Sequence, residues 1–308
     1  MRNLIVYTLV LLSLQSREIT SLSSFLPHLC HHDESLALLQ LKQMFQKSTD
    51  ASAYCENAYP KMISWSKTSD CCTWDGVTCH RVTGHVIGID LSCCQLQGSI
   101  YANSSLFNLS RLQKLNLAYN DFKNSPISHG IGGLTSLTNL NLSNSNFYGQ
   151  IPSQISLLSN LVSLDLSQNP IEFEHQDFQL LLQNITQVRI LSLSNVSIFS
   201  EFPKNFSSSL TIVDLGQTQV YGKLPDHIFY LAKLQQLILD GTQVTGSLPN
   251  FNCTASYMLS YLDLADTNFS GELPNTFGCL KFLNSMLLDG CQFTGRLPES
   301  IGNHFVLH

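Results

Sequence analysis

The chain has 308 residues, a formal net charge of −6 and only 12% charged residues, about half the ~25% typical of soluble domains. This mildly acidic balance lacks the basic stripe on which nucleic-acid binding depends, so we expect no nucleic-acid partner. Length alone suggests roughly two domains, although a repeated motif can build one long body instead.

The first residues have the pattern of a secretory signal peptide. Arg2 precedes an apolar run from Leu4 to Leu14, and small residues follow between positions 21 and 24. The run is shorter than the ~20 residues needed to cross a bilayer. We therefore predict a signal peptide over residues 1–24 and an exported mature chain. A buried helix or a membrane anchor is the alternative, and no other segment is long and apolar enough to span a membrane.

Cysteine and sequon usage also favours export. Seven of the ten cysteines lie between positions 30 and 94, which indicates a disulfide-bonded cap over residues 28–84. A zinc site would need paired CxxC or CxxH units, and the segment from Cys71 to Cys79 lacks them. Eight N-x-[ST] sequons are candidate glycosylation sites, at Asn103, Asn108, Asn141, Asn184, Asn195, Asn205, Asn252 and Asn268.

The rest of the chain repeats one motif, L-x-x-L-x-L-x-x-N-x-L, as in LQKLNLAYNDF at 112–122 and LSYLDLADTNF at 259–269. The last strand leucine recurs every 22–27 residues, at Leu91, Leu117, Leu142, Leu166, Leu193, Leu215, Leu239, Leu264 and Leu288. Because L-x-L alternates with period two, its leucines point to one side, and stacked copies can merge them into one core. We predict an α/β-type leucine-rich-repeat solenoid over residues 85–308, with about eight or nine repeats and a parallel sheet on its concave face.

Two further positions recur in each repeat. Asn120 and Asn169 stand where an inward amide can bond backbone between turns, and small residues replace them at Ser145, Thr218, Thr242, Thr267 and Cys291. Val196 cannot make that bond, which marks an irregular repeat, and Cys94 and Cys291 are expected to be buried thiols in this position. A Gly-x-[Ile/Leu]-Pro element follows, beginning at Gly149, Gly222, Gly246, Gly271 and Gly295. Short helical turns are expected after it. The segment after Leu166 lacks the element and is predicted to form a distorted turn.

Gly-x-[Ile/Leu]-Pro is typical of the plant-specific class of leucine-rich repeats. The segments Cys30-His-His-Asp33, Ser64-Trp65 and Asp70-Cys71-Cys72-Thr-Trp74-Asp-Gly76 resemble the plant leucine-rich-repeat N-terminal domain. The closest resemblance is to the Cladosporium-resistance (Cf) class of receptor-like proteins. It implies the N-terminal part of a plasma-membrane receptor ectodomain that perceives a pathogen effector or elicitor and signals through partner receptor kinases.

Members of that class carry a single membrane helix and a short tail without a kinase. This sequence stops at His308 without a C-terminal cap, a membrane helix or a tail. We therefore expect a fragment, a truncated gene model or a pseudogene-like copy of such an ectodomain. Its last repeat, from about residue 283 onward, is expected to fray because repeat arrays need a polar capping repeat.

The resemblance also implies three disulfides, Cys30–Cys71, Cys72–Cys79 and Cys55–Cys93. A fourth pair follows from the repeat spacing. Cys253 and Cys279 come 14 and 15 residues after their own strand leucines, Leu239 and Leu264. They are therefore expected one repeat apart, at a separation that a disulfide can span.

Residues between the strand leucines face outward on the concave side. Asp214 and Asp263 lie in this column, and Asp240, Asp266 and Asp289 lie in the next columns, just after the second leucine; together these five form a predicted acidic patch over repeats five to eight. Such a patch favours a basic peptide or protein ligand; ordinary solvated charge is the alternative. The Asn141 sequon lies on a concave strand, where a glycan would cover the surface. The ligand is therefore expected nearer the C-terminal repeats.

Catalysis finds no support in the sequence. It lacks G-x-S-x-G, H-E-x-x-H and P-loop motifs, and His31-His32 beside Asp33 is a weak metal-like string in which Asp33 is better explained as a helix cap or first-turn acid. We expect no enzymatic activity, no cofactor, no metal and no small-molecule substrate. The predicted function is extracellular ligand recognition in plant defence. The alternatives are a secreted inhibitor of cell-wall-degrading enzymes, like the polygalacturonase-inhibiting proteins, and the ectodomain of a receptor kinase.

Overall fold

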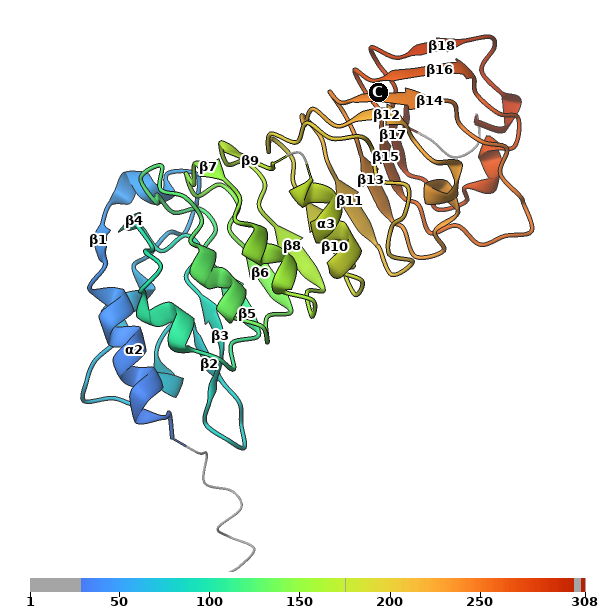
Figure 1. The fold of residues 1–308 in the computed structure, drawn as a ribbon. Coiled ribbons are helices and arrows are strands. Elements are labelled where there is room, and N and C mark those ends of the chain that lie inside the picture. Colours follow the sequence, from blue (N-terminus) through green and yellow to red (C-terminus); the bar gives the residue numbers. More distant parts are fainter. Residues whose placement is uncertain (1–28, 175, 302–305, 308) are drawn as a thin grey trace, which may run out of the picture.

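The computed structural model describes residues 29–174, 176–301 and 306–307; the predicted signal peptide lies outside these residues. The described chain forms an elongated, twisted solenoid (Figure 1). The strands of its longest sheet are β2 (Val77–Cys79), β3 (Val86–Asp90), β5 (Lys114–Asn116), β6 (Asn139–Asn141), β8 (Ser163–Asp165), β10 (Ile190–Ser192), β11 (Ile212–Asp214), β13 (Gln236–Ile238), β15 (Tyr261–Asp263), β17 (Ser285–Leu287) and β19 (Val306–Leu307). These eleven strands lie side by side in that order. All neighbours are parallel except β2 and β3.

Shorter strands pair beside this sheet. They are β1 (Phe45–Lys47) with β4 (Leu96–Gly98), β7 (Gly149–Gln150) with β9 (Ile171–Glu172), and the parallel series β12 (Tyr221–Lys223), β14 (Gln243–Gly246), β16 (Asn268–Glu272) and β18 (Gln292–Thr294). The α-helices are α2 (His32–Lys42) and α3 (Asp177–Asn184). The 3₁₀ helices are η1 (Thr49–Ser52), η2 (Lys61–Ser64), η3 (Cys71–Thr73), η4 (Ser105–Asn108), η5 (His129–Gly133), η6 (Ser153–Leu157), η7 (Asp226–Tyr230), η8 (Phe277–Cys279) and η9 (Glu299–Ile301). Short helical turns therefore do follow the Gly-x-x-Pro elements, as at η6 and η7.

The repeat register aligns the strand leucines into rows. Leu115 pairs with Leu140, Leu140 with Leu164 and Leu164 with Leu191 across successive strands. All four side chains are buried, and each such burial contributes on the order of 1.5–3 kcal/mol. The solenoid fold predicted from the L-x-L period is confirmed, with one continuous core along its length.

Hydrogen bonds from inward-pointing side chains stabilise the turn that follows each strand. The chain turns through a residue with positive φ, such as Tyr119 at 57° or Gln217 at 57°, and the next side chain then points inward. Asn120 Nδ2 donates to the carbonyl oxygens of Leu91 (2.8 Å) and Leu117 (2.9 Å), which joins neighbouring repeats. The hydroxyl of Thr242 reaches only its own repeat, at Leu239 O (2.6 Å). An asparagine here therefore links two turns, whereas a threonine closes one.

The irregular repeat differs from the distorted turn that the sequence predicted. Residues Asp177–Asn184 form the α-helix α3, which stacks after η5 and η6 on the face opposite the long sheet. Phe178, Leu181 and Ile185 are fully buried, and their i, i+3, i+7 spacing places them on one helix face. The prediction was wrong because a missing Gly-x-x-Pro was taken as loss of order, although the apolar spacing suits a helix.

The N-terminal segment, residues 29–84, closes one end of the solenoid. Helix α2 packs on η4, where Ser105 Oγ donates to Ala37 O at 2.7 Å. Trp65 and Trp74 stack with ring centroids 5.5 Å apart and are buried. These contacts cover the apolar edge that the first repeat would otherwise expose.

Four disulfides join Cys30 to Cys71, Cys55 to Cys93, Cys72 to Cys79 and Cys253 to Cys279, with Cα–Cα distances of 5.6, 5.9, 5.4 and 4.8 Å. Cys94 and Cys291 are free thiols. Cys94 is fully buried, as expected for its inward position, but Cys291 is only half-buried. Both thiols were expected to be buried. Cys291 is more exposed than expected because the last described repeat is covered less completely than the repeats before it.

Candidate ligand-binding surface

The concave face changes character along the solenoid. On β5, β6 and β8 its outward positions carry Lys114, Asn116, Asn139, Asn141 and Ser163. From β10 onward, aliphatic side chains appear there: Ile190, Ile212 and Ile238 are half-buried on the strands β10, β11 and β13. The C-terminal half of the face is therefore the part that offers apolar contact area.

Four aspartates of the predicted acidic patch form a zigzag over this half. Asp214 is the last residue of β11 and Asp263 the last residue of β15. Asp240 and Asp289 lie two residues past the ends of the intervening strands β13 and β17. Since Asp214 pairs with Ile238, and Ile238 with Asp263, successive repeats present one carboxylate each, alternating with an aliphatic side chain.

A glycine brings two of these carboxylates together. Gly216 follows Asp214 by two residues, and Asp240 Oδ1 occupies the space that a Cβ on Gly216 would fill. Gln217 Nε2 holds the other oxygen of that carboxylate, donating to Asp240 Oδ2 at 2.7 Å. Because glycine has no side chain, position 216 leaves room for the carboxylate of Asp240 to approach Asp214.

The local environment raises the pKa of two of the aspartates. Burial is the main reason that the pKa of Asp214 lies above its ordinary value, and the negative charge of Asp240 adds to it. Burial likewise raises the pKa of Asp263, with further contributions from Asp240 and Asp289. Burial and the Asp263 charge raise the pKa of Tyr261, whose hydroxyl donates to Asp263 Oδ2 at 3.2 Å.

The five aspartates differ in accessibility. Asp266 and Asp289 are exposed, Asp214 and Asp240 are half-buried, and Asp263 is only 8% exposed. Direct contact through Asp263, which the sequence led us to expect, is therefore limited by its burial among its own neighbours. Among the described residues, none of the five forms an ion pair, so their charge is uncompensated by cations of this part of the chain.

The N-terminal half of the concave face carries a hollow of about 450 Å³. It is lined by Gly88, Lys114, Asn116 and Asn141, among others. The half-buried Asn141 side chain accepts hydrogen bonds from the Ser143 amide (2.9 Å) and hydroxyl (2.7 Å). Its sequon thus lies on the concave strand β6. The other seven predicted glycosylation asparagines are exposed, at Asn103, Asn108, Asn184, Asn195, Asn205, Asn252 and Asn268.

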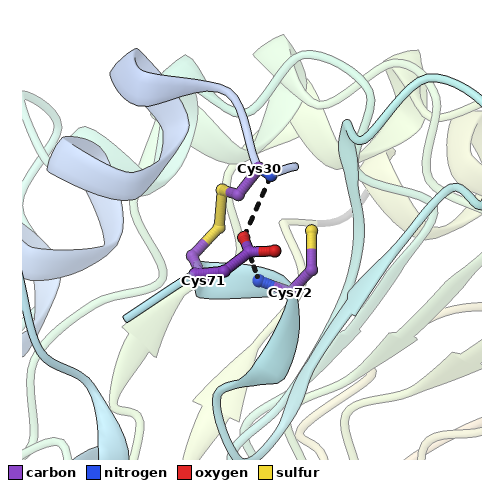
Figure 2. Close-up of side chains that lie close together, drawn as sticks. Cys30, Cys71 and Cys72 are labelled. Carbon is purple, nitrogen blue, oxygen red and sulfur yellow. Dashed lines mark hydrogen bonds between the residues drawn. A yellow bond between two sulfur atoms is a disulfide. The ribbon is translucent and has the colours of Figure 1, made fainter. Parts of the chain in front are cut away.

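One group of ligand-type side chains in the described residues has metal-like spacing, namely Cys30, Asp70, Cys71 and Cys72 (Figure 2). Its sulfurs belong to disulfides: Cys30 is joined to Cys71, and Cys72 to Cys79. Asp70 Oδ1 accepts from the amides of Cys30 (3.0 Å) and Cys72 (3.2 Å). The carboxylate therefore acts as a clamp on the two backbone segments that the disulfides connect.

Sequence reasoning missed four contacts that attach the N-terminal segment to the first repeats. Glu34 accepts from Val86 N (2.8 Å) and from His85 Nδ1 (3.1 Å), and His85 stacks on His31 with centroids 3.8 Å apart. Lys61 forms an ion pair with Asp90 at 3.1 Å. The partners are 29 to 54 residues apart, so no local pattern reveals them. Asp33, the predicted cap or first-turn acid, lies in the first turn of α2.

No helix among the described residues is long and apolar enough to cross a membrane. Two sequence families match the chain: the Leucine rich repeat N-terminal domain at residues 31–80, and the Leucine Rich Repeat at 136–158 and 258–280. Among solved structures, a plant ice-binding protein aligns with 88% of this chain and 90% of its own at a TM-score of 0.60 and 21% identity. The ectodomain of the Arabidopsis receptor kinase HAESA aligns with 89% of this chain and 52% of its own at 0.56 and 21%. At these identities the likeness shows the fold alone.

Curated relatives are more similar in sequence. The chain is 43% identical to receptor-like protein Cf-9 of Solanum pimpinellifolium over 239 residues, 74% of this chain and 28% of the relative. It is 40% identical to receptor-like protein 6 of Arabidopsis thaliana over 261 residues, 79% of this chain and 26% of the relative. The chain thus spans about a quarter of the length of the curated relatives it matches. With the repeat pattern and the N-terminal disulfides, these matches show that the chain is a leucine-rich-repeat protein of the plant receptor-like protein family, Cf class.

Proposed function

We propose that this chain is part of a ligand-recognition ectodomain that acts in plant defence, on the extracellular side, through binding rather than catalysis. The relatives are receptor-like proteins. A related fold, the HAESA ectodomain, is described in complex with a peptide hormone ligand. Signalling by the whole protein is proposed to pass through partner receptor kinases.

The observation that carries the proposal is the row of uncompensated carboxylates on β11 and β15 and just after β13 and β17. Each lies beside an aliphatic or small residue, so the surface suits a ligand with both cationic and apolar side chains. Charge complementarity of this kind governs association rate and partner choice. We therefore propose an extended basic peptide, or a basic protein segment, as the ligand of this region.

The position of Asn141 also favours the C-terminal half of the concave face as the ligand site. A glycan on this asparagine would fill the hollow around Gly88 and Lys114 and exclude a protein ligand there. The proposed ligand site therefore begins beyond β8 and extends toward β17.

The test compares two sets of three neutral substitutions in the secreted chain. One set, Asp240→Ala, Asp266→Ala and Asp289→Ala, removes charge from the patch without creating a new glycosylation sequon. The control set, Asp50→Ala, Asp177→Ala and Asp226→Ala, removes equal charge elsewhere. The probe is a displayed library of eight-residue peptides, half containing Lys and Arg and half containing Asp and Glu.

We expect the unaltered chain to enrich basic, partly apolar peptides. The patch set should weaken those peptides about tenfold or more, since each desolvated charge contact is worth at least 1 kcal/mol. The control set should bind like the unaltered chain. Equal enrichment of basic peptides by the patch set would refute the proposed ligand surface.

A further inference from the structure

The irregular repeat forms one wall of a groove. This groove lies between α3 and the segment 200–208, on the helical side of the solenoid, and encloses about 1120 Å³. Two hydrogen bonds connect its walls: Gln179 Nε2 donates to Glu201 O at 2.8 Å, and Ser207 Oγ donates to Thr186 O at 2.8 Å. The groove is therefore formed in advance and needs no rearrangement to accept an occupant.

A glycosylation sequon lies in the groove wall. Asn205, in Asn205-Phe-Ser207, lines the groove and is exposed, and within the described chain its carboxamide makes no hydrogen bond. A second sequon asparagine, Asn184, ends α3 beside Gln183, another lining residue. Attachment at Asn205 would start a glycan inside the groove rather than on an open surface.

The lining suits a sugar in both its polar and its apolar parts. Amides and hydroxyls of Gln179, Gln183, Thr186 and Ser208 offer donors and acceptors to sugar hydroxyls and acetamido groups. Leu180, which is 42% exposed, and Tyr221 offer apolar surface to the C–H faces of a pyranose ring. Concave sites of this composition, with a few convergent polar groups on an apolar wall, are those that hold small polar molecules.

Helix α3 is held by the packing of Phe178 and Leu181 and not by capping of its first turn. It has eight residues and no side-chain N-cap hydrogen bond, and isolated helices of this length are marginal in water. An occupant that covers Leu180 would therefore stabilise the helix that replaces the Gly-x-x-Pro turn.

We propose that Asn205 carries an N-linked glycan whose first two N-acetylglucosamine units fold back into this groove and pack on α3. In the attachment step the Asn205 Nδ2 nitrogen forms a bond to the anomeric carbon of a lipid-diphosphate-linked oligosaccharide. The nitrogen loses one proton and the lipid diphosphate leaves. The groove is thus a binding site for the chain's own modification, separate from the concave surface and independent of the proposed ligand.

The test uses the full chain secreted from plant cells. Glycopeptide mass spectrometry measures occupancy at Asn205, and an endoglycosidase that cuts between the two N-acetylglucosamines measures glycan access under native conditions. We expect release from Asn205 to be at least about threefold slower than from Asn103, an exposed sequon outside the groove, since burial protects a linkage in proportion to its opening equilibrium. Leu180→Ser, a change at an exposed wall residue, should bring the two rates together.

Amide hydrogen exchange of residues 177–184 supplies a second readout. Asn205→Gln should speed exchange there, whereas Asn184→Gln and Asn103→Gln should not. An unmodified Asn205 would overturn the proposal. So would release as fast as from Asn103, or an α3 that responds to Asn184→Gln and not to Asn205→Gln.

Discussion

Asp240 Oδ1 lies in the place that the Cβ of Gly216 would take, one strand away, and it holds this position beside Asp214. Two carboxylates of neighbouring repeats are thereby kept close without a cation from the described chain between them. The two negative charges repel each other on the concave face, and the stability of the solenoid therefore depends on pH.

Replacing Asp240 with serine, which removes the charge without creating a glycosylation sequon, should stabilise the fold at neutral pH. The pKa values of Asp214 and Asp263 are raised above the ordinary 3.8, so the folded state binds more protons than the unfolded state just above that pH. Stability therefore falls as pH rises through the raised pKa values and remains lower at pH 7. After allowance for solvent screening, Asp240→Ser should raise the free energy of unfolding by about 0.5 kcal/mol at pH 7.

Chemical denaturation at pH 7 and pH 3 measures this effect. At pH 3 the gain should disappear, because Asp214 and Asp263 are then protonated in the folded state. Asp226→Asn, on the 3₁₀ helix η7, is the control that changes net charge equally. A gain of the same size at both pH values would show that repulsion on the concave face is not its source.

Ligand binding should follow the same titration. As pH falls through the raised pKa values, Asp214 and Asp263 lose their charge, so the affinity for a basic peptide should fall about threefold to tenfold. Isothermal titration with one selected basic peptide, from pH 7 to pH 4, measures the change. The double substitution Asp214→Asn and Asp263→Asn should make the peptide affinity nearly independent of pH. If the affinity of that variant still fell with pH as in the unaltered chain, Asp214 and Asp263 would not be the titrating groups.

The inward asparagines should matter more than the inward threonines. Asn120 donates to two repeats, and its Oδ1 also accepts from the amides of Cys94 (3.2 Å) and Leu96 (3.0 Å). Asn120→Ala leaves several buried backbone groups unpaired and should cost about 3 kcal/mol, whereas Thr242→Val loses one bond and should cost about 1 kcal/mol. Urea denaturation of the two variants compares them directly. Equal losses would refute the inter-repeat role of the amide.

Glu34 should be important for the attachment of α2, although its sequence context resembles that of its neighbour Asp33. Glu34→Ala removes the acceptor for Val86 N and His85, so the free energy of unfolding should fall by about 1–3 kcal/mol. Asp33→Ala, an exposed acid in the same helical turn, is the matched control and should change stability by less than about 0.5 kcal/mol. Similar melting temperatures for the two variants would show that the Glu34 contacts are incidental.

Much of the fold could be read from residue spacing. Leu115, Leu140 and Leu164 are equivalent in sequence and adjacent in space, because a stacked repeat turns sequence period directly into strand register. Spacing was less informative where the period breaks. The absence of Gly-x-x-Pro after Leu166 suggested a distorted turn, and only the packed positions of Phe178 and Leu181 show that a helix fills the gap.

For the candidate site, the sequence placed Asp214, Asp240, Asp263, Asp266 and Asp289 on one face, since alternation along a strand determines which side a residue takes. The sequence could not predict which of them are exposed. Asp263 is nearly buried, whereas Asp214 at the equivalent position of β11 is half-buried, because exposure depends on which neighbouring side chains cover each carboxylate. For Asp263, that packing involves Tyr261 of the same strand and Asp240 of the neighbouring repeat.

The sequence alone therefore determined the solenoid, its inward leucines and asparagines and the strand face of each aspartate, all of which follow from local periodicity. Tertiary structure decided the groove beside α3, the Glu34 attachment and the close approach of Asp240 to Asp214. These features depend on contacts between residues that are distant in sequence, where the free energy of packing and desolvation is set by shape and not by spacing.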